Sequence, residues 1–118
     1  SLNESSPNFP YTLGRLFSVY EAVQQAANPA INPTIKDRYF NSAAATPATI
    51  FPILGNLCQK HLRKLDKGLQ TYYNQQICKI KDILSEAYPT RLSLPQQGSF
   101  DLGYYHQTQK RYTKKEDK

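Results

Sequence analysis

The sequence predicts an all-α protein, a compact helical bundle of about five helices joined by short connections. Every strong apolar pattern repeats at three- and four-residue steps, which is the period of an α-helix. No segment alternates apolar and polar residues over more than a few positions, as a half-buried strand would. Proline and asparagine pairs divide the chain of 118 residues into stretches of helical length, enough for one domain with one core.

The first two helices are expected at residues 11–27 and 33–44. The apolar stripe of the first consists of Leu13, Leu16, Phe17, Tyr20, Val23 and Ala27. Asn28-Pro29 ends this helix, because the residue before a proline is disfavoured in the α region. Asn32 then serves as the N-cap of the second helix, with Pro33 at its first position.

Thr46-Pro47 marks the start of a third helical segment. Pro52 has no N–H to donate and crowds the carbonyl of Ala48, which predicts a kink, or an isolated turn before a main helix at 51–65. The apolar face of this segment consists of Phe51, Leu54, Cys58, Leu62, Leu65 and Leu69. The sequence thus predicts a third helix anchored to the core along one side.

Gly68 separates the third helix from a fourth at 69–87, which Pro89 stops. Pro95 opens a fifth helix that reaches about Tyr112. Gly98 and Gly103 each weaken its helix propensity by about 1 kcal/mol relative to alanine, so packing must hold it. We expect an irregular lead-in at 1–10, a helical-bundle domain at 11–112 and a charged, disordered tail at 113–118.

The positive charge is concentrated after residue 33. The chain has a net charge of +6, and residues 34–118 carry 14 basic against 7 acidic residues, a net charge of +7. This balance favours an acidic partner, although many basic domains bind none. The polar N-terminus and the lack of a long apolar run predict a cytoplasmic protein without a membrane segment. Cys58 and Cys78 are then most simply read as reduced thiols.

The strongest candidate site is a basic stripe at the end of the third helix. Its members fall within about 100° of one another on a helical wheel, opposite the apolar face; they are Lys60, Arg63, Lys64 and Lys67. A solvated face without a ligand is the alternative. Two further pairs are candidates: Lys36 with Arg38, and Lys110 with Arg111. Arg38 is equally suited to bracing an interhelical corner. Because no groove-reading motif occurs, any binding should be to phosphates without sequence preference.

The sequence offers few components for catalysis. His61 borders the apolar face and is expected to be a half-buried structural imidazole. His106 could stack on a base, but we favour a packing role. No cluster of metal ligands, phosphate-binding loop or paired nucleophile and base is visible. We therefore expect no enzyme activity, no metal, no cofactor and no small-molecule substrate.

Five segments of the sequence closely resemble one family. They are 11–21 (YTLGRLFSVYE), 35–40 (IKDRYF), 45–52 (ATPATIFP), 61–65 (HLRKL) and 97–107 (QGSFDLGYYHQ). They resemble the C-terminal region of the large subunit of the type I-C CRISPR Cascade effector. In that subtype the same region is also made separately, by an internal translation start, as the small subunit. The resemblance covers about residues 9–112.

The resemblance implies a non-catalytic helical-bundle subunit. Its partners would be the backbone and large subunits of Cascade, other copies of itself, and the R-loop formed with the guide RNA. It would stabilise the displaced non-target strand, for which contacts from lysine and arginine to the DNA backbone are suitable because base pairing supplies the sequence specificity. The alternative is a purely structural protein–protein adaptor without direct DNA contact. A nuclease would need a metal site that the sequence does not display.

Overall fold

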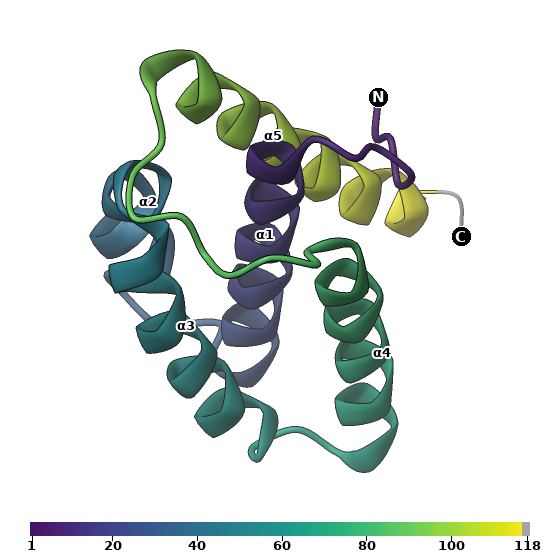
Figure 1. Cartoon of the computed structure of the whole chain (residues 1–118). Helices are drawn as coiled ribbons and strands as arrows, with labels where there is room; N and C mark the ends of the chain where they lie inside the picture. The colour runs from purple at the N-terminus through teal and green to yellow at the C-terminus, as the bar shows by residue number, and fades with distance from the viewer. Residues whose placement is uncertain (117–118) are drawn as a thin grey trace.

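The helix α1 (Phe9–Ala27) runs through the middle of the molecule, and the other four helices pack around it (Figure 1). They are α2 (Ile35–Ala45), α3 (Pro47–Leu62), α4 (Lys67–Ile83) and α5 (Leu94–Glu116). The computed structural model describes residues 1–116, with the side chains of residues 1–112, and this range contains no strand. The predicted all-α bundle of five helices is confirmed.

The burial of α1 differs from the prediction. The sequence predicts one apolar stripe, but residues 10–24 are buried on every side of the helix. The polar side chains buried with the stripe include Arg15, Glu21 and Gln24. Because they are at most 5% exposed, most of their polar atoms need partners within the protein. The central helix therefore carries a set of internal polar contacts, which the apolar periodicity does not show.

Capping residues explain where the first two helices begin. The side chain of Asn8 accepts a hydrogen bond from the backbone N–H of Tyr11, so α1 starts at Phe9 rather than at residue 11. Thr34, not Asn32, caps α2. Its hydroxyl accepts from the N–H of Asp37, and the Asp37 carboxylate accepts from the N–H of Thr34. This reciprocal pair starts α2 two residues later than expected.

The α3 helix is continuous from Pro47 through Pro52, so the expectation of an isolated first turn is wrong. It ends at Leu62, three residues before the expected end. The helix α4 starts at Lys67, where the Asp66 carboxylate accepts from the N–H of Leu69, and ends at Ile83, four residues before the expected end. At the C-terminus α5 continues to Glu116. The expected tail at 113–118 is thus helical in backbone to Glu116, and residues 117–118 lie outside the described range.

Two glycines allow α1 and α5 to cross at very short distance. A Cβ atom on Gly14 would collide with the carbonyl oxygen of Phe100 and would lie 2.8 Å from the backbone nitrogen of Tyr104. A Cβ atom on Gly103 would collide with the carbonyl oxygen of Tyr11. The weak helix former Gly103 is therefore held by packing, as the sequence predicts, and its missing side chain is what permits the crossing.

Aromatic rings fill the core where α1, α2, α3 and α5 meet. Phe17, Phe51 and Phe100 are at most 1% exposed. The ring centre of Phe100 lies 6.0 Å from that of Phe17 and 6.3 Å from that of Phe51. Edge-to-face contacts at such distances are favourable for aromatic pairs. The helix α4 lies outside this cluster and packs mainly on α1. This placement leaves a cleft between α4 and α5, with α1 as its floor.

Candidate nucleic-acid interface

The four cations of the predicted basic stripe lie around the corner that joins α3 to α4, and all four are exposed. Lys60 is in the last turn of α3, Arg63 is the C-cap, Lys64 is in the connecting turn and Lys67 opens α4. The N–H of Lys64 donates to the carbonyl of His61, and that of Leu65 donates to the carbonyl of Leu62, which tightens the chain into a turn. The stripe is therefore a basic corner and not one face of a single helix.

The charge of this basic corner, residues 60–67, is not compensated by ion pairs. Within the part of the chain whose side chains are described, no carboxylate lies within 4 Å of any of its four cations. Asp66 is the one acidic residue of the corner, and its carboxylate is used to cap α4. Like charges this close in sequence repel one another weakly, so an incoming anion would relieve that repulsion.

Lys36 and Arg38, on α2, lie against aromatic rings. The Nζ of Lys36 lies 5.2 to 5.7 Å from the ring centres of Phe40, Tyr104 and Tyr105, within the range of a cation–π interaction. The exposed guanidinium of Arg38 lies 5.7 Å from the ring of Tyr39. Lys36 is thus used to cover the join between α2 and α5, and it is less available to a ligand than the basic corner.

Lys110 and Arg111, on α5, have internal partners. Lys110 forms an ion pair with Glu4, and this hydrogen bond is the main cause that lowers the pKa of the Glu4 carboxyl. Arg111 is half-buried. Its Nη1 donates to the carbonyl oxygen of Ser18 at 3.2 Å, and its Nη2 lies 3.7 Å from Oε1 of Glu21. The structure therefore does not bring these two cations together with the basic corner.

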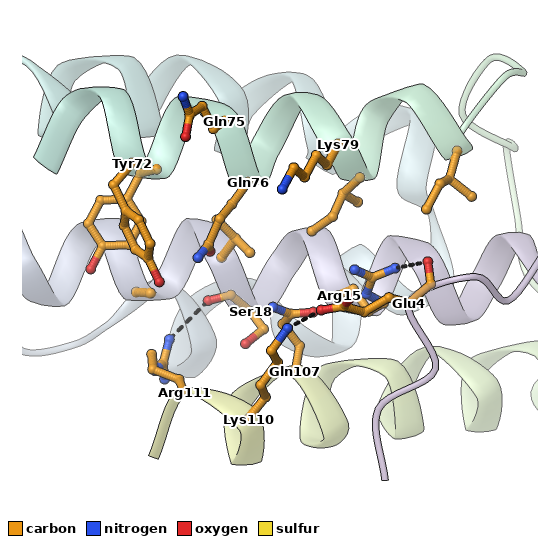
Figure 2. Close-up of a pocket in the computed structure, with 15 residues that line it drawn as sticks. Glu4, Arg15, Ser18, Tyr72, Gln75, Gln76, Lys79, Gln107, Lys110 and Arg111 are labelled. Atoms are coloured by element: carbon orange, nitrogen blue, oxygen red, sulfur yellow. Dashed lines mark hydrogen bonds and ion pairs between the residues drawn. The ribbon is translucent and has the colours of Figure 1, made fainter. Parts of the chain in front are cut away.

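The cleft between α1, α4 and α5 has a volume of about 450 Å³, a size usual for ligand sites. Arg15 on α1, Lys79 on α4, and Lys110 and Arg111 on α5 place four cations in its lining, together with the carboxylate of Glu4 (Figure 2). This cleft was not predicted from the sequence. The one signal for it is the pair of small residues Ser18 and Ala22, one helical turn apart on α1, which line its floor.

Two of the segments that carry the family resemblance, 11–21 and 97–107, form much of the interface between α1 and α5. Arg15 Nε donates to Oε1 of Gln107 at 3.0 Å, and the Tyr104 hydroxyl donates to Oε1 of Glu21 at 2.6 Å. The hydroxyl of Tyr11 lies 2.8 Å from Nδ1 of His106, so the predicted packing role of His106 fits its position. These residues stabilise the fold, because each satisfies a polar group that packing removes from water.

His61 and Cys58 lie on α3 with their polar atoms turned away from solvent. Both ring nitrogens of His61 are buried, and neither has a hydrogen-bond partner among the described residues; burial, followed by the nearby charge of Lys64, lowers the pKa of His61. His61 is thus the half-buried imidazole that the sequence predicts. Burial also raises the pKa of the Cys58 thiol to about 12, while Cys78 is exposed and both are free thiols. A group of three or more metal-ligating side chains is absent from the described residues.

The fold and the basic corner define a class of protein: an all-α domain with an exposed cationic surface and an interior polar interface between its central and last helices. The chain belongs to the CRISPR-associated protein family Cas_Csd1, whose family model matches residues 1–112. No curated protein matches the sequence. In the described part of the chain no helix is both long enough and apolar enough to cross a lipid bilayer.

Proposed function

We propose that this chain acts as the non-catalytic small subunit of a type I-C Cascade surveillance complex in the cytoplasm. It holds the displaced non-target DNA strand of the R-loop by contacts that do not depend on sequence. Its protein partners are the backbone and large subunits and further copies of itself. The basic corner at 60–67 makes the main DNA contact, while Lys36, Arg38, Lys110 and Arg111 contribute less because they have internal partners.

One observation carries this proposal: four exposed cations, none of which pairs with a described carboxylate, lie at one corner of a domain from a CRISPR-associated family. A displaced strand varies in sequence but always carries phosphates. Lysine and arginine on a rigid corner bind such a strand by neutralising phosphates and releasing counterions. The specificity for the target then comes from pairing with the guide, so the small subunit needs no groove-reading helix.

The alternative, a purely structural adaptor, is favoured by the outer face of α5. Four large apolar residues of this helix are at least half exposed: Leu94, Leu102, Tyr105 and Tyr112. Exposed apolar residues gathered on one element are typical of protein–protein contacts. Protein contacts through α5 would not by themselves exclude DNA binding, since the exposed face of α5 and the basic corner lie on different elements.

The test is binding of fluorescent oligothymidylate across a series of salt concentrations. If all four cations contact phosphates of a single strand, the slope of log K against log salt is about −2.8, from roughly −0.7 for each contact. The double variant Lys60→Glu, Lys64→Glu should make the slope less steep by about 1.4. The matched control is Lys81→Glu, Arg91→Glu, which makes the same charge change at exposed positions outside the corner.

Two results would contradict direct contact between the basic corner and DNA. One is an affinity for oligothymidylate that does not change with salt concentration, and the other is a control variant that loses as much affinity as the corner variant. A flat response together with normal assembly of the complex would favour the adaptor. Since all four substituted side chains are exposed, neither variant should lower the melting temperature by more than a few degrees, which circular dichroism can verify.

A further inference from the structure

The cleft between α1, α4 and α5 holds a buried charge that lacks an ion pair. Arg15 is 5% exposed, and its two hydrogen bonds go to uncharged acceptors, Oε1 of Gln107 and the carbonyl oxygen of Glu4. Among the described side chains no carboxylate lies within 4 Å of its guanidinium. Buried charges in proteins are normally paired with an opposite charge, so this position favours an incoming anion.

Two further cations line the same cleft with donors still free. Among the described residues, the buried Nη2 atom of Arg111 has no hydrogen-bond partner, and the nearest carboxylate oxygen, 3.7 Å away on Glu21, already accepts from the Tyr104 hydroxyl. The ammonium of Lys79 has no carboxylate within 4 Å in the described range. Arg15, Lys79 and Arg111 come from three helices and line one cavity, which is the arrangement of an anion site (Figure 2).

The N-terminal segment of the chain indicates which kind of anion fits. Glu4 places a peptide carbonyl on Nη1 of Arg15 and a carboxylate on Nζ of Lys110, so the edge of the cleft already binds an acidic peptide segment. Gln75, Gln76 and Gln107 also line the cleft, and their side-chain amides can both donate to and accept from a peptide backbone.

A strand of nucleic acid fits this cleft less well. The carboxylate of Glu4 lines it and would face the phosphates of a strand, and the buried carboxylate of Glu21, beside Arg111, adds a second negative charge close to the cleft. The four cations are thereby reduced to a net charge of about +2, which matches one or two carboxylates. Within the described range, no carboxylate forms an ion pair with the basic corner.

We propose that this cleft is a docking site for an acidic, extended peptide segment of a partner protein, with one partner carboxylate bound between Arg15, Lys79 and Arg111. Glu4 stays on Lys110 at the edge, and the partner segment occupies the remaining part of the cavity. Apolar side chains of the floor and wall, Val19 and Ile80 among them, contact the uncharged part of the segment. The site is separate from the basic corner and does not depend on its binding to DNA.

The test uses the full chain and two synthetic octapeptides, one of alternating glutamate and alanine and its glutamine counterpart. Titration followed by NMR should show saturable shifts of the Gln76 and Gln107 side-chain amides with the glutamate peptide alone. Lys79→Glu should weaken this binding at least about tenfold. Lys81→Glu, the same change on the same helix outside the cleft, should weaken it less than about twofold.

Equal binding of the two peptides, equal effects of the two variants, or no shift at about 1 mM peptide would overturn the proposal. Oligothymidylate that displaces the peptide from the cleft would also overturn it, by assigning the cleft to nucleic acid. The Lys60→Glu, Lys64→Glu variant should bind the peptide as the parent does. Failure of this site and failure of the basic corner in DNA binding are thus measured separately.

Discussion

The crossing of α1 and α5 makes a sharp prediction for Gly103→Ala. The new Cβ atom would collide with the carbonyl oxygen of Tyr11 and would lie 2.7 Å from its carbonyl carbon and 3.1 Å from its Cα. All three are backbone atoms of a buried helix, so the neighbour cannot give way as a flexible side chain would. The two helices must move apart to accept the methyl group.

The magnitude follows from two opposing effects. Alanine gains about 1 kcal/mol of helix propensity over glycine. Overpacking a tight site costs about 1–3 kcal/mol, and separating the helices also weakens the hydrogen bonds of Arg15 and Glu21 across the interface, each worth about 1–3 kcal/mol. We therefore expect a net loss of roughly 2 kcal/mol or more in the free energy of unfolding, a fall in Tm of about 8 °C.

Gly98→Ala is the matched control, because Gly98 lies in the same helix with nothing within 4 Å of the position of its new Cβ. It should stabilise the protein by about 0.5–1 kcal/mol through propensity alone. Urea unfolding and thermal scans of the two variants and the parent measure the difference. If Gly103→Ala were as stable as Gly98→Ala, the close crossing of α1 and α5 would be wrong.

Three further predictions concern the core and its buried polar groups. Leu62→Ala should lower the free energy of unfolding by about 2–5 kcal/mol, because Leu62 is 2% exposed at the end of α3. Tyr104→Phe should lower it by about 1–3 kcal/mol, because the buried Glu21 carboxylate loses its hydroxyl donor. The lowered pKa of His61 means that the unfolded chain binds a proton more readily, so stability falls as the pH falls through about 6.5; His61→Leu should remove that part of the loss.

Urea titrations at pH 8, 7, 6 and 5 measure all three, with the parent in every series. If Leu62→Ala left the urea midpoint unchanged, Leu62 would not be buried, and the orientation of α3 about its own axis would be wrong. If Tyr104→Phe were as stable as the parent, the hydrogen bond from the Tyr104 hydroxyl to Glu21 would contribute nothing to the free energy of unfolding. Parallel pH curves for the parent and His61→Leu would show that His61 has the same pKa folded and unfolded.

The sequence predicts the helices well where caps and apolar steps agree. It fails where tertiary contacts decide, as at the end of α3, where neither glycine nor proline stands and Arg63 retains helical dihedral angles. The start of α2 was readable, since Thr34 and Asp37 are spaced as a capping box, but the nearby Asn32-Pro33 offered a competing start. When two helix-start signals stand in one short segment, the sequence alone does not decide which of them begins the helix; the packing of the helix does.

For the candidate site, too, some properties were predicted from the sequence and others depend on tertiary contacts. The exposure of the four corner residues was predicted correctly, although the chain turns after Leu62 and only Lys60 lies on α3. Their charge compensation was not predicted, because it depends on residues far away in sequence. Lys110 pairs with Glu4 across 106 positions, and Lys36 lies on rings from α5. Such contacts leave no trace in periodicity, so the sequence predicts all eight basic residues as candidates, although four of them have partners within the protein.

The crossing of α1 and α5 also has a consequence for synthesis of the chain. The face of α1 that carries Gly14 and Ser18 is covered by α5, which leaves the ribosome after α1 to α4. Until then this face stays open to water and to other nascent chains, and the contacts that close it span most of the polypeptide. We expect the domain to complete its folding only once α5 has left the ribosome, so that a chain truncated before α5 would be a substrate for chaperones and proteases.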